Sequence, residues 1–335
     1  MKYPNFLTNK INLIAPSFGC TTEPYKSRLK MAIRHFNRLG IKVIEGKNIY
    51  LSNGPRSNTA YECAKEFIDA YKDNNFIMSV GGGNLEGEII DYIDFEKLKD
   101  LSPTYFMGYS DNTNISFLLT TISDVASIYG YNAPEFGSTK LEKSHIDQLN
   151  LIKGKELKFI GYDKFELNSI KDESNPYANY NLDAKKELIL INSNDINISG
   201  RLIGGCIDCL TYLVGTKYDN VNMFCEKYKN DGIIWFLESC DLEAWNLKLA
   251  LLQMKRACWF KYLKGFLIGR PYKYNTDFCG LTINQAIIDV LKEFNVPIII
   301  NADFGHLKPQ LPILCGAVAK VKAKDNDLTI EYILK

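Results

Sequence analysis

Short apolar runs alternate with amphipathic helical stretches through the first half of the chain, and this alternation constrains the fold more than any other sequence feature. The apolar runs span residues 11–17, 41–46, 76–82 and 104–110. The stretches between them, which carry apolar residues at three- and four-residue spacing, span 25–40, 58–73 and 85–94. Strands that alternate with helices in this way form βαβ units and a mostly parallel sheet, covered by helices on both faces.

The second half of the chain has a different character and begins with a polar, turn-rich segment. Further strand patterns occur at 187–193, 196–205, 232–239, 263–270, 296–305, 313–323 and 328–335, with helical patterns at 206–216, 242–260 and 283–294. At 335 residues the chain exceeds a typical single core. We therefore expect an α/β protein with a parallel-sheet N-terminal domain at 1–150, an interdomain connection at 151–185, and a smaller mixed α/β C-terminal domain at 186–335.

Charge and hydropathy argue against two classes of protein. Forty basic and thirty-nine acidic residues leave a net charge of +1, and no run of Lys or Arg forms a footprint for a phosphate backbone. No apolar run approaches the roughly 18 residues of a membrane span, and the first residues lack the apolar core of a signal peptide. We expect a cytoplasmic protein that binds neither nucleic acid nor membrane.

The nine cysteines predict neither disulfides nor a metal site. Their number is odd and they are scattered along the chain, as in proteins from reducing compartments. Only Cys206 and Cys209 are closely spaced, and zinc would need a second ligand pair of this kind. We interpret both as core cysteines and expect no metal and no cofactor.

Histidine is the commonest proton shuttle near neutral pH, and the chain has only three. His35 falls in an amphipathic helical stretch and His145 in a polar stretch, so we expect both to be solvated side chains. His306 follows the apolar run that ends near 305, at the carboxyl end of an expected buried strand. Ligands of open α/β sheets gather at such strand ends, and His306 is therefore the candidate general base.

A serine follows another apolar run at a sharp turn. In the sequence GYSD, Gly108 permits a tight bend and Ser110 precedes an apolar helical stretch. A serine held at a strand-to-helix turn has an exposed hydroxyl, and the adjacent helix amino terminus offers free N–H groups to a developing oxyanion. The GxSxG pattern is only half matched, since Asn112 stands at the second glycine position. The alternative is that Ser110 or Asp111 simply caps the helix.

A carboxylate ends a third apolar run. Glu238 closes the sequence GIIWFLE, a setting in which an ionised side chain needs a partner. It is the candidate for orienting an imidazole, as the third member of a catalytic triad does. Asp241 and Glu243 compete for this role, although their positions also suit helix capping.

A glycine-rich turn follows the run at 76–82. Its glycines resemble a phosphate-cradling turn, but Glu86 occupies the last position of a GxGxxG pattern and no Walker lysine is present. A dinucleotide fold is therefore weakly indicated. The same turn can instead lend backbone N–H groups to an oxyanion hole beside Ser110.

Together these motifs resemble the LD-carboxypeptidase family, which includes the microcin C immunity proteins. The similarity runs through nearly the whole chain, in IAPS, IMSVGGGNLEGEIIDYID, GYSDNT, GRLIGG, WFLE and FGHLKPQLPI. The resemblance implies a flavodoxin-like first domain that carries the serine, a second domain that carries the glutamate and the histidine, and a homodimer.

The resemblance also implies roles for single residues. The implied catalytic triad consists of Ser110, Glu238 and His306. The implied oxyanion donors are the backbone N–H groups of Gly82, Gly83 and Asp111. The implied substrate-binding positions are Asn84 and Cys206, of which the second is commonly asparagine in the family.

The implied activity is that of a serine carboxypeptidase-type hydrolase acting on an amide-type bond in a small peptide or a peptidyl-nucleotide. The stretches IMSVGGGN and YIDFEKL are more similar to the microcin immunity branch than to the cell-wall recycling branch. A substrate with a free carboxylate needs a cation, and Arg201 and Arg270 are the candidates. Two alternatives stay open: a muramoyl-tetrapeptide LD-carboxypeptidase, and a noncatalytic protein that binds nucleotides or peptides.

Overall fold

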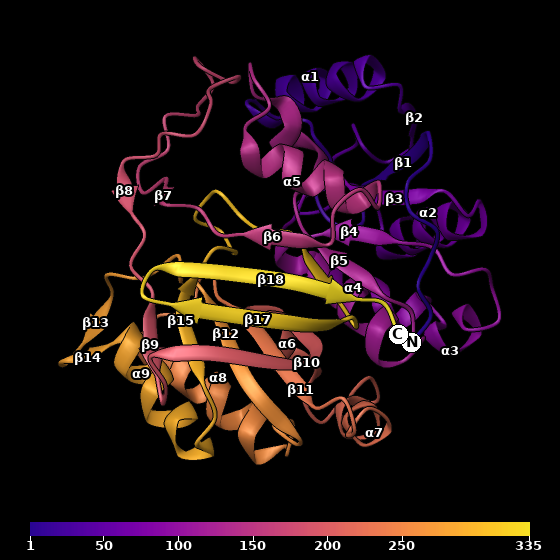
Figure 1. The fold of residues 1–335 in the computed structure, drawn as a ribbon. Coiled ribbons are helices and arrows are strands. Elements are labelled where there is room, and N and C mark those ends of the chain that lie inside the picture. The colour runs from indigo at the N-terminus through magenta and orange to yellow at the C-terminus, as the bar shows by residue number, and fades with distance from the viewer. The chain divides into compact units, whose positions relative to one another are not determined.

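The computed structural model describes residues 1–335, which form two compact units. Unit 1 comprises residues 1–157 and 168–181, and unit 2 comprises residues 158–167 and 182–335. The segment 151–185, expected to be a connection, is divided between them, because residues 158–167 belong to unit 2 and 168–181 to unit 1. Each unit has its own central sheet (Figure 1).

Unit 1 contains a parallel sheet in which the strands lie in the order β2-β1-β3-β4-β5. The strands are β1 (Lys10–Ile14), β2 (Lys42–Glu45), β3 (Phe76–Ser79), β4 (Phe106–Gly108) and β5 (Ser127–Tyr129). This order is the flavodoxin-like one, in which the chain reverses its direction of winding after β2. Every residue of β3, β4 and β5 is buried, as expected for a sheet covered on both faces. The predicted α/β fold with parallel strands is confirmed.

Two of the three helical stretches predicted for the first half of the chain, those at 25–40 and 58–73, contain α-helices in the structure. The elements are α1 (Tyr25–Arg38), α2 (Ala60–Lys72), α3 (Phe95–Leu98), α4 (Thr113–Thr121), α5 (Lys143–Ile152), η1 (Glu86–Tyr92), η2 (Ser110–Asn112) and η3 (Ala133–Gly137), where η denotes a 3₁₀-helix. The stretch at 85–94, expected to be an α-helix, is the 3₁₀-helix η1. Gly87 lies inside this short stretch, and a glycine costs about 1 kcal/mol relative to alanine in an α-helix.

Unit 2 contains an eight-stranded mixed sheet with the order β6-β18-β17-β10-β11-β12-β15-β9. The strands are β6 (Lys158–Ile160), β9 (Ile189–Ile191), β10 (Asp195–Cys206), β11 (Ile233–Glu238), β12 (Leu263–Gly269), β15 (Ile298–Ala302), β17 (Val318–Lys324) and β18 (Asp327–Ile333). The four strands β10, β11, β12 and β15 are parallel, and the outer strands are antiparallel to them or to one another. The carboxyl ends of the parallel strands therefore meet at one edge of the sheet.

The remaining elements of unit 2 are helices and short strands. The helices are α6 (Ile207–Leu213), α7 (Val221–Lys227), α8 (Ala244–Arg256), α9 (Ile283–Leu291) and η4 (Lys292–Phe294). The short strands are β7 (Lys164–Phe165), β8 (Ala184–Lys185), β13 (Asp277–Phe278), β14 (Leu281–Thr282) and β16 (Ile313–Cys315).

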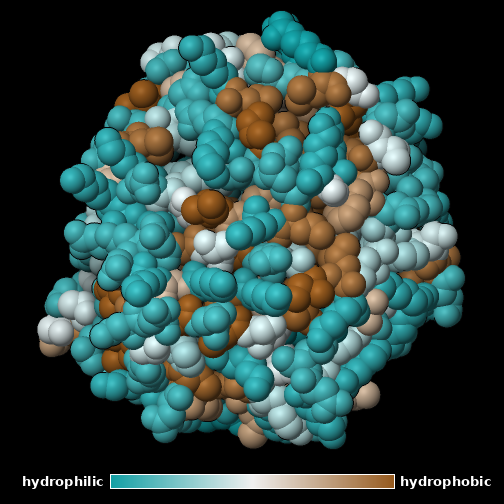
Figure 2. Space-filling view, in the orientation of Figure 1, coloured by the Kyte–Doolittle hydropathy of each residue, from teal (hydrophilic) through white to brown (hydrophobic).

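Hydrophilic residues cover most of the face drawn in Figure 2, with smaller hydrophobic patches between them. None of the helices combines the length and the hydrophobicity that a bilayer crossing requires. No disulfide joins the cysteines.

Candidate active site

Ser110 lies at the turn between a buried strand and a buried helix of unit 1. β4 ends at Gly108, the 3₁₀-helix η2 begins at Ser110, and α4 follows from Thr113. Ser110 has φ of +66°, a left-handed conformation that costs a residue other than glycine on the order of 1 kcal/mol or more. Neither Ser110 nor Asp111 caps α4, whose N-cap is Asn112 without a side-chain cap. The turn thus has the strained geometry of a nucleophile elbow rather than of a capped helix.

Side-chain hydrogen bonds hold this turn in place. The Ser110 backbone N–H donates to the Tyr129 hydroxyl at 3.1 Å. The Asn112 amide donates to the carbonyl oxygens of Gly81 and Tyr109, both at 3.0 Å. The glycine-rich loop after β3 and the serine turn after β4 are therefore tied together by Asn112, the residue that departs from GxSxG.

The glycines after β3 permit close packing beside the serine. A Cβ on Gly82 would lie 3.1 Å from Ser110 Cβ and 3.3 Å from its hydroxyl oxygen. A Cβ on Gly83 would lie 2.3 Å from the Ser17 hydroxyl, which in turn donates to the Asp111 carboxylate at 2.6 Å. The backbone at Gly82 thus lies against the candidate nucleophile, whereas the Asn84 side chain is exposed.

Replacing Gly108 by alanine is expected to destabilise the protein. The new Cβ would lie 2.7 Å from Asn112 Cγ, so the amide would have to move and lose its two carbonyl partners. We expect the unfolding free energy to fall by about 1–3 kcal/mol in urea denaturation. Gly87→Ala is the matched control, since its Cβ would approach nothing closer than 3.8 Å. Equal urea midpoints for the two variants would contradict this account of the turn.

In unit 2 the structure brings Glu238 and His306 together. Glu238 is the last residue of β11 and is 1% exposed. Its Oε2 lies 2.8 Å from Nδ1 of His306, which follows β15. A carboxylate oxygen accepts hydrogen bonds, so the tautomer of a neutral imidazole that fits this contact carries its proton on Nδ1 and has Nε2 as its basic nitrogen. The rival carboxylates Asp241 and Glu243 are exposed.

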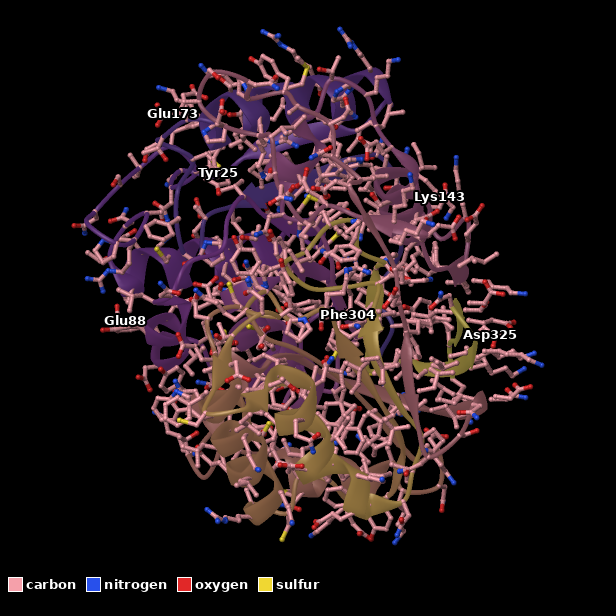
Figure 3. All side chains as sticks on the ribbon, turned by 90° about the vertical axis from the view of Figure 1, so that its left-hand side faces the viewer. Tyr25, Glu88, Lys143, Glu173, Phe304 and Asp325 are labelled. Atoms are coloured by element: carbon pink, nitrogen blue, oxygen red, sulfur yellow. The ribbon has the colours of Figure 1, made fainter.

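Glycines allow the histidine loop to approach the glutamate closely. Gly305 has φ of +108°, and a Cβ there would lie 3.1 Å from Glu238 Oε2. A Cβ on Gly269, at the end of β12, would lie 2.5 Å from the Phe304 carbonyl oxygen. Phe304, the residue before Gly305, is fully buried within unit 2. Figure 3 shows it in the interior, in contrast to Asp325 of the β17–β18 turn, which lies at the periphery. The loop that carries His306 therefore packs closely against the ends of β11 and β12.

Cys206 and Asp208 lie beside Glu238. Cys206 is the register partner of Glu238 across β10 and β11. A hydrogen bond with Cys209, together with burial, raises the pKa of the Cys206 thiol, so it stays protonated and is not a competing nucleophile. The Asp208 carboxylate accepts the backbone N–H groups of Cys240 at 3.1 Å and Asp241 at 2.8 Å, which fixes the turn after Glu238. Sequence reasoning missed Asp208; an acidic residue two positions after the β10 end was the available signal.

The two candidate arginines occupy different places in unit 2. Arg201 lies in β10 opposite Ile233, five residues before the Cys206 and Glu238 pair. Its guanidinium binds Asp231, with an Nε to Oδ2 distance of 3.0 Å, and lies over the Tyr228 ring. The structure therefore does not bring Arg201 to Glu238. Arg270 follows the end of β12, and its guanidinium nitrogens bind groups of the loop that carries His306.

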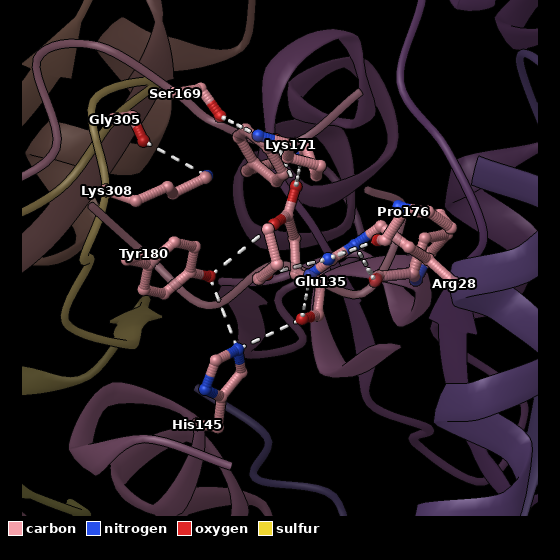
Figure 4. A network of polar contacts seen from close by, with 12 residues as sticks. Arg28, Glu135, His145, Ser169, Lys171, Pro176, Tyr180, Gly305 and Lys308 are labelled. Atoms are coloured by element: carbon pink, nitrogen blue, oxygen red, sulfur yellow. Dashed lines mark hydrogen bonds and ion pairs between the residues drawn. The ribbon is translucent and has the colours of Figure 1, made fainter. Parts of the chain in front are cut away.

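The prediction that His145 is solvated is wrong. Its ring is fully buried and stacks on Tyr180 with centroids 5.3 Å apart. Nδ1 accepts the Glu142 N–H at 2.9 Å, so the proton is on Nε2, which donates to the Glu135 carbonyl oxygen at 3.0 Å. Figure 4 shows this network, in which Arg28 binds the Glu135 carbonyl and the segment at 176–178. His145 therefore stabilises unit 1. His35 is half-buried and contacts the Ser138 carbonyl oxygen.

Burial makes His145 a source of acid instability. It lowers the pKa of His145 from the ordinary 6.5 to about 4. Between these values the unfolded chain binds a proton that the folded chain does not, so the unfolding free energy falls as the pH is lowered from 6.5 towards 4. The unfolding free energy lost over this pH range is on the order of 3 kcal/mol. Urea denaturation at several pH values should show a flatter dependence for His145→Asn than for the wild type, and parallel dependences would contradict the assignment.

Two family models match this chain, one in each half of the sequence. Residues 11–130 match the LD-carboxypeptidase N-terminal domain, and residues 199–321 match the LD-carboxypeptidase C-terminal domain. Together the two matches cover most of the chain, and both are domains of one family of peptidases, a class of hydrolases. The chain belongs to the LD-carboxypeptidase family.

Particular relatives lie in the microcin-immunity group. The Microcin C7 self-immunity protein MccF of Escherichia coli is 20% identical over 313 residues, which cover 91% of this chain and 88% of that protein. The crystal structure of an MccF-like protein from Bacillus anthracis superposes with a TM-score of 0.83 at 22% identity, covering 99% of this chain and 100% of that one. A structure of MccF in complex with aspartyl sulfamoyl adenosine gives a TM-score of 0.79 at 20% identity, and the match covers 99% of this chain and 98% of that one.

Proposed function

We propose that this protein is a serine hydrolase of the carboxypeptidase type that cleaves an amide-type bond in a small peptide or a peptidyl-nucleotide, with Ser110, Glu238 and His306 as its catalytic triad. The observation that carries the proposal is the 2.8 Å contact between His306 Nδ1 and the buried Glu238 carboxylate. This pair leaves Nε2 as a base, which is what a serine nucleophile requires. The left-handed turn at Ser110 supports the same assignment.

The proposed reaction proceeds in two halves. The Ser110 hydroxyl attacks the acyl carbon while His306 Nε2 takes its proton, and Glu238 stabilises the imidazolium that forms. The C–N bond then breaks, the leaving nitrogen receives that proton, and the acyl group remains on the serine. Water cleaves the ester in the second half by the same proton transfers. In this scheme the backbone N–H groups of Gly82, Gly83 and Asp111 stabilise the oxyanion, each such donor contributing about 3–4 kcal/mol.

The proposed substrate is an aminoacyl or peptidyl nucleotide analogue rather than a cell-wall peptide. Support comes from relatives, since structures of MccF hold aspartyl sulfamoyl adenosine and glutamyl sulfamoyl guanosine. Asn84 and Cys206 are the proposed substrate-contacting positions. Cys206 lies in register with Glu238, so a group bound there would lie beside the proposed triad. We leave Arg201 out of the proposed site, because its guanidinium binds Asp231 and the residue lies five positions before the Cys206 and Glu238 pair along the sheet. We also propose that the protein works as a cytoplasmic homodimer.

Two substrates distinguish the proposals. The protein is incubated separately with aspartyl sulfamoyl adenosine and with a muramoyl tetrapeptide, and the products are followed by liquid chromatography and mass spectrometry. We expect release of aspartate and sulfamoyl adenosine by the wild type, and none by Ser110→Ala. Release of D-alanine from the tetrapeptide alone would instead establish the cell-wall recycling activity. Tight binding of the nucleotide without turnover would establish a noncatalytic binding protein.

A further inference from the structure

Arg270 lies at the centre of a buried polar cluster in unit 2. The residue is 2% exposed and follows β12 directly. Its Nη1 donates to Asp303 Oδ1 at 2.6 Å, and its Nη2 donates to the carbonyl oxygens of Leu307, at 3.0 Å, and Pro309. These three partners come from one loop, and they lie before and after His306 in the sequence. A single guanidinium therefore joins both sides of the histidine loop.

Asp303 is anchored on its other side as well. It is completely buried, and its Oδ2 accepts from Lys186 Nζ and from the Tyr162 N–H, both at 3.2 Å. A Cβ on Gly161 would lie 2.3 Å from this oxygen, so only glycine leaves room for the carboxylate. The backbone carbonyl of Asp303 accepts the Leu311 N–H at 2.6 Å. The loop is thus fixed to the segments at 161–162 and 186 as well as to Arg270.

The loop has further attachments of its own. Lys308 Nζ lies 3.4 Å from the Gly305 carbonyl oxygen, as Figure 4 shows, and the Lys308 carbonyl accepts the Glu166 N–H at 2.7 Å. Gly305 itself approaches Glu238 closely, as described above. A shift of this loop would therefore change the contact between the imidazole and the carboxylate directly.

Buried ion pairs of this kind are poor sources of net stability, because removing two charges from water offsets most of their attraction. They do fix geometry, and the planar guanidinium is suited to this, since it presents five donors in a rigid fork. We propose that Arg270 is a positioning residue, which acts through Asp303 and the two loop carbonyls to hold His306 Nδ1 against Glu238. The inference rests on the proposed function, because it assigns Arg270 a part in the same triad.

This assignment replaces the idea that Arg270 binds the carboxylate of a substrate. A carboxylate clamp uses two parallel N–H donors. Both terminal nitrogens of Arg270 already donate to the histidine loop, and the side chain is buried. The two roles give opposite kinetic signatures: a clamp lowers the substrate affinity, whereas a positioning residue lowers the turnover of bound substrate.

The test compares Arg270→Lys and Asp303→Asn with Arg201→Lys as the matched control. Arg201 is also 2% exposed and also binds an aspartate, but it lies away from Glu238. For Arg270→Lys and Asp303→Asn we expect kcat to fall about a hundredfold, the size of effect that follows a misplacement of about 1 Å, with KM within about twofold of the wild type. Arg201→Lys should lower the melting temperature but leave kcat unchanged. A KM increase with unchanged kcat, or an unchanged kcat in both variants, would overturn the proposal.

A second readout does not require turnover. A proton on Nδ1 that is held by a carboxylate gives a downfield proton NMR resonance, which is assigned to His306 by its absence in His306→Ala. We expect this resonance to be lost or broadened in Arg270→Lys and Asp303→Asn and kept in Arg201→Lys. If it is unchanged in all three, the positioning role is wrong. If instead the wild type cleaves no substrate while the resonance behaves as expected, the proposed function fails and the positioning role survives.

Discussion

Ser110→Ala is expected to lower kcat by a factor of about 10,000 to 1,000,000, the range seen when the nucleophile of a serine hydrolase is removed. In the proposed reaction the substitution removes the hydroxyl that forms the acyl-enzyme, and the proposed backbone donors can then assist only a direct attack by water. Stability should change little, because alanine adds no atoms to the packed turn. Steady-state kinetics on the cleaved nucleotide substrate, with enzyme concentration determined from folded protein, provides the measurement.

Ser116→Ala is the matched control for this experiment. Ser116 lies in α4, is 2% exposed and contacts the Thr113 carbonyl, so its loss tests whether removing any buried hydroxyl near the turn impairs activity. We expect wild-type kcat for Ser116→Ala. Retention of more than a tenth of the activity in Ser110→Ala would show that another group is the nucleophile.

Glu238→Gln is expected to lower kcat by a factor of about 1,000 to 10,000, as neutralising the triad carboxylate does in other serine hydrolases. Glutamine is nearly isosteric and can still contact Nδ1, but it no longer stabilises the imidazolium that forms when His306 accepts the serine proton. It can also hold the ring in the wrong tautomer by donating to Nδ1. KM should change much less than kcat.

Glu243→Gln is the comparison variant for the carboxylate. Glu243 is exposed, is the N-cap residue of α8 and makes no side-chain cap. Its kcat should equal that of the wild type. Equal activity of Glu238→Gln and Glu243→Gln would remove Glu238 from the mechanism and with it the observation on which the proposed function depends.

Features of the fold set by local patterns could be predicted from the sequence. The alternation of apolar runs and helical periodicity indicated the parallel sheet of unit 1, and the family resemblance implied the flavodoxin-like strand order that the structure has. The strand-to-helix turn at Ser110, the strand end at Glu238 and the place of His306 in the loop after β15 also follow from local sequence. Parallel strands align their carboxyl ends, so the approach of Glu238 to His306 is a consequence of the sheet topology.

Features set by distant contacts could not be predicted. His145 lies in a polar stretch, yet Tyr180 and the Glu135 carbonyl, from two other segments, bury its ring. The partners of Arg270 likewise come from the loop at 303–309, more than thirty residues away. The environment of a polar side chain depends on which segments pack against it, and sequence periodicity does not carry that information.

Reaction with a fluorophosphonate, followed by peptide mapping, tests the central claim most directly. The reagent phosphonylates only a serine whose hydroxyl is activated by a base. We expect one adduct per chain, on Ser110, which is absent in Ser110→Ala and forms far more slowly in His306→Ala and Glu238→Gln. An adduct on another residue, or labelling of Ser110 at the same rate without His306 and Glu238, would contradict it.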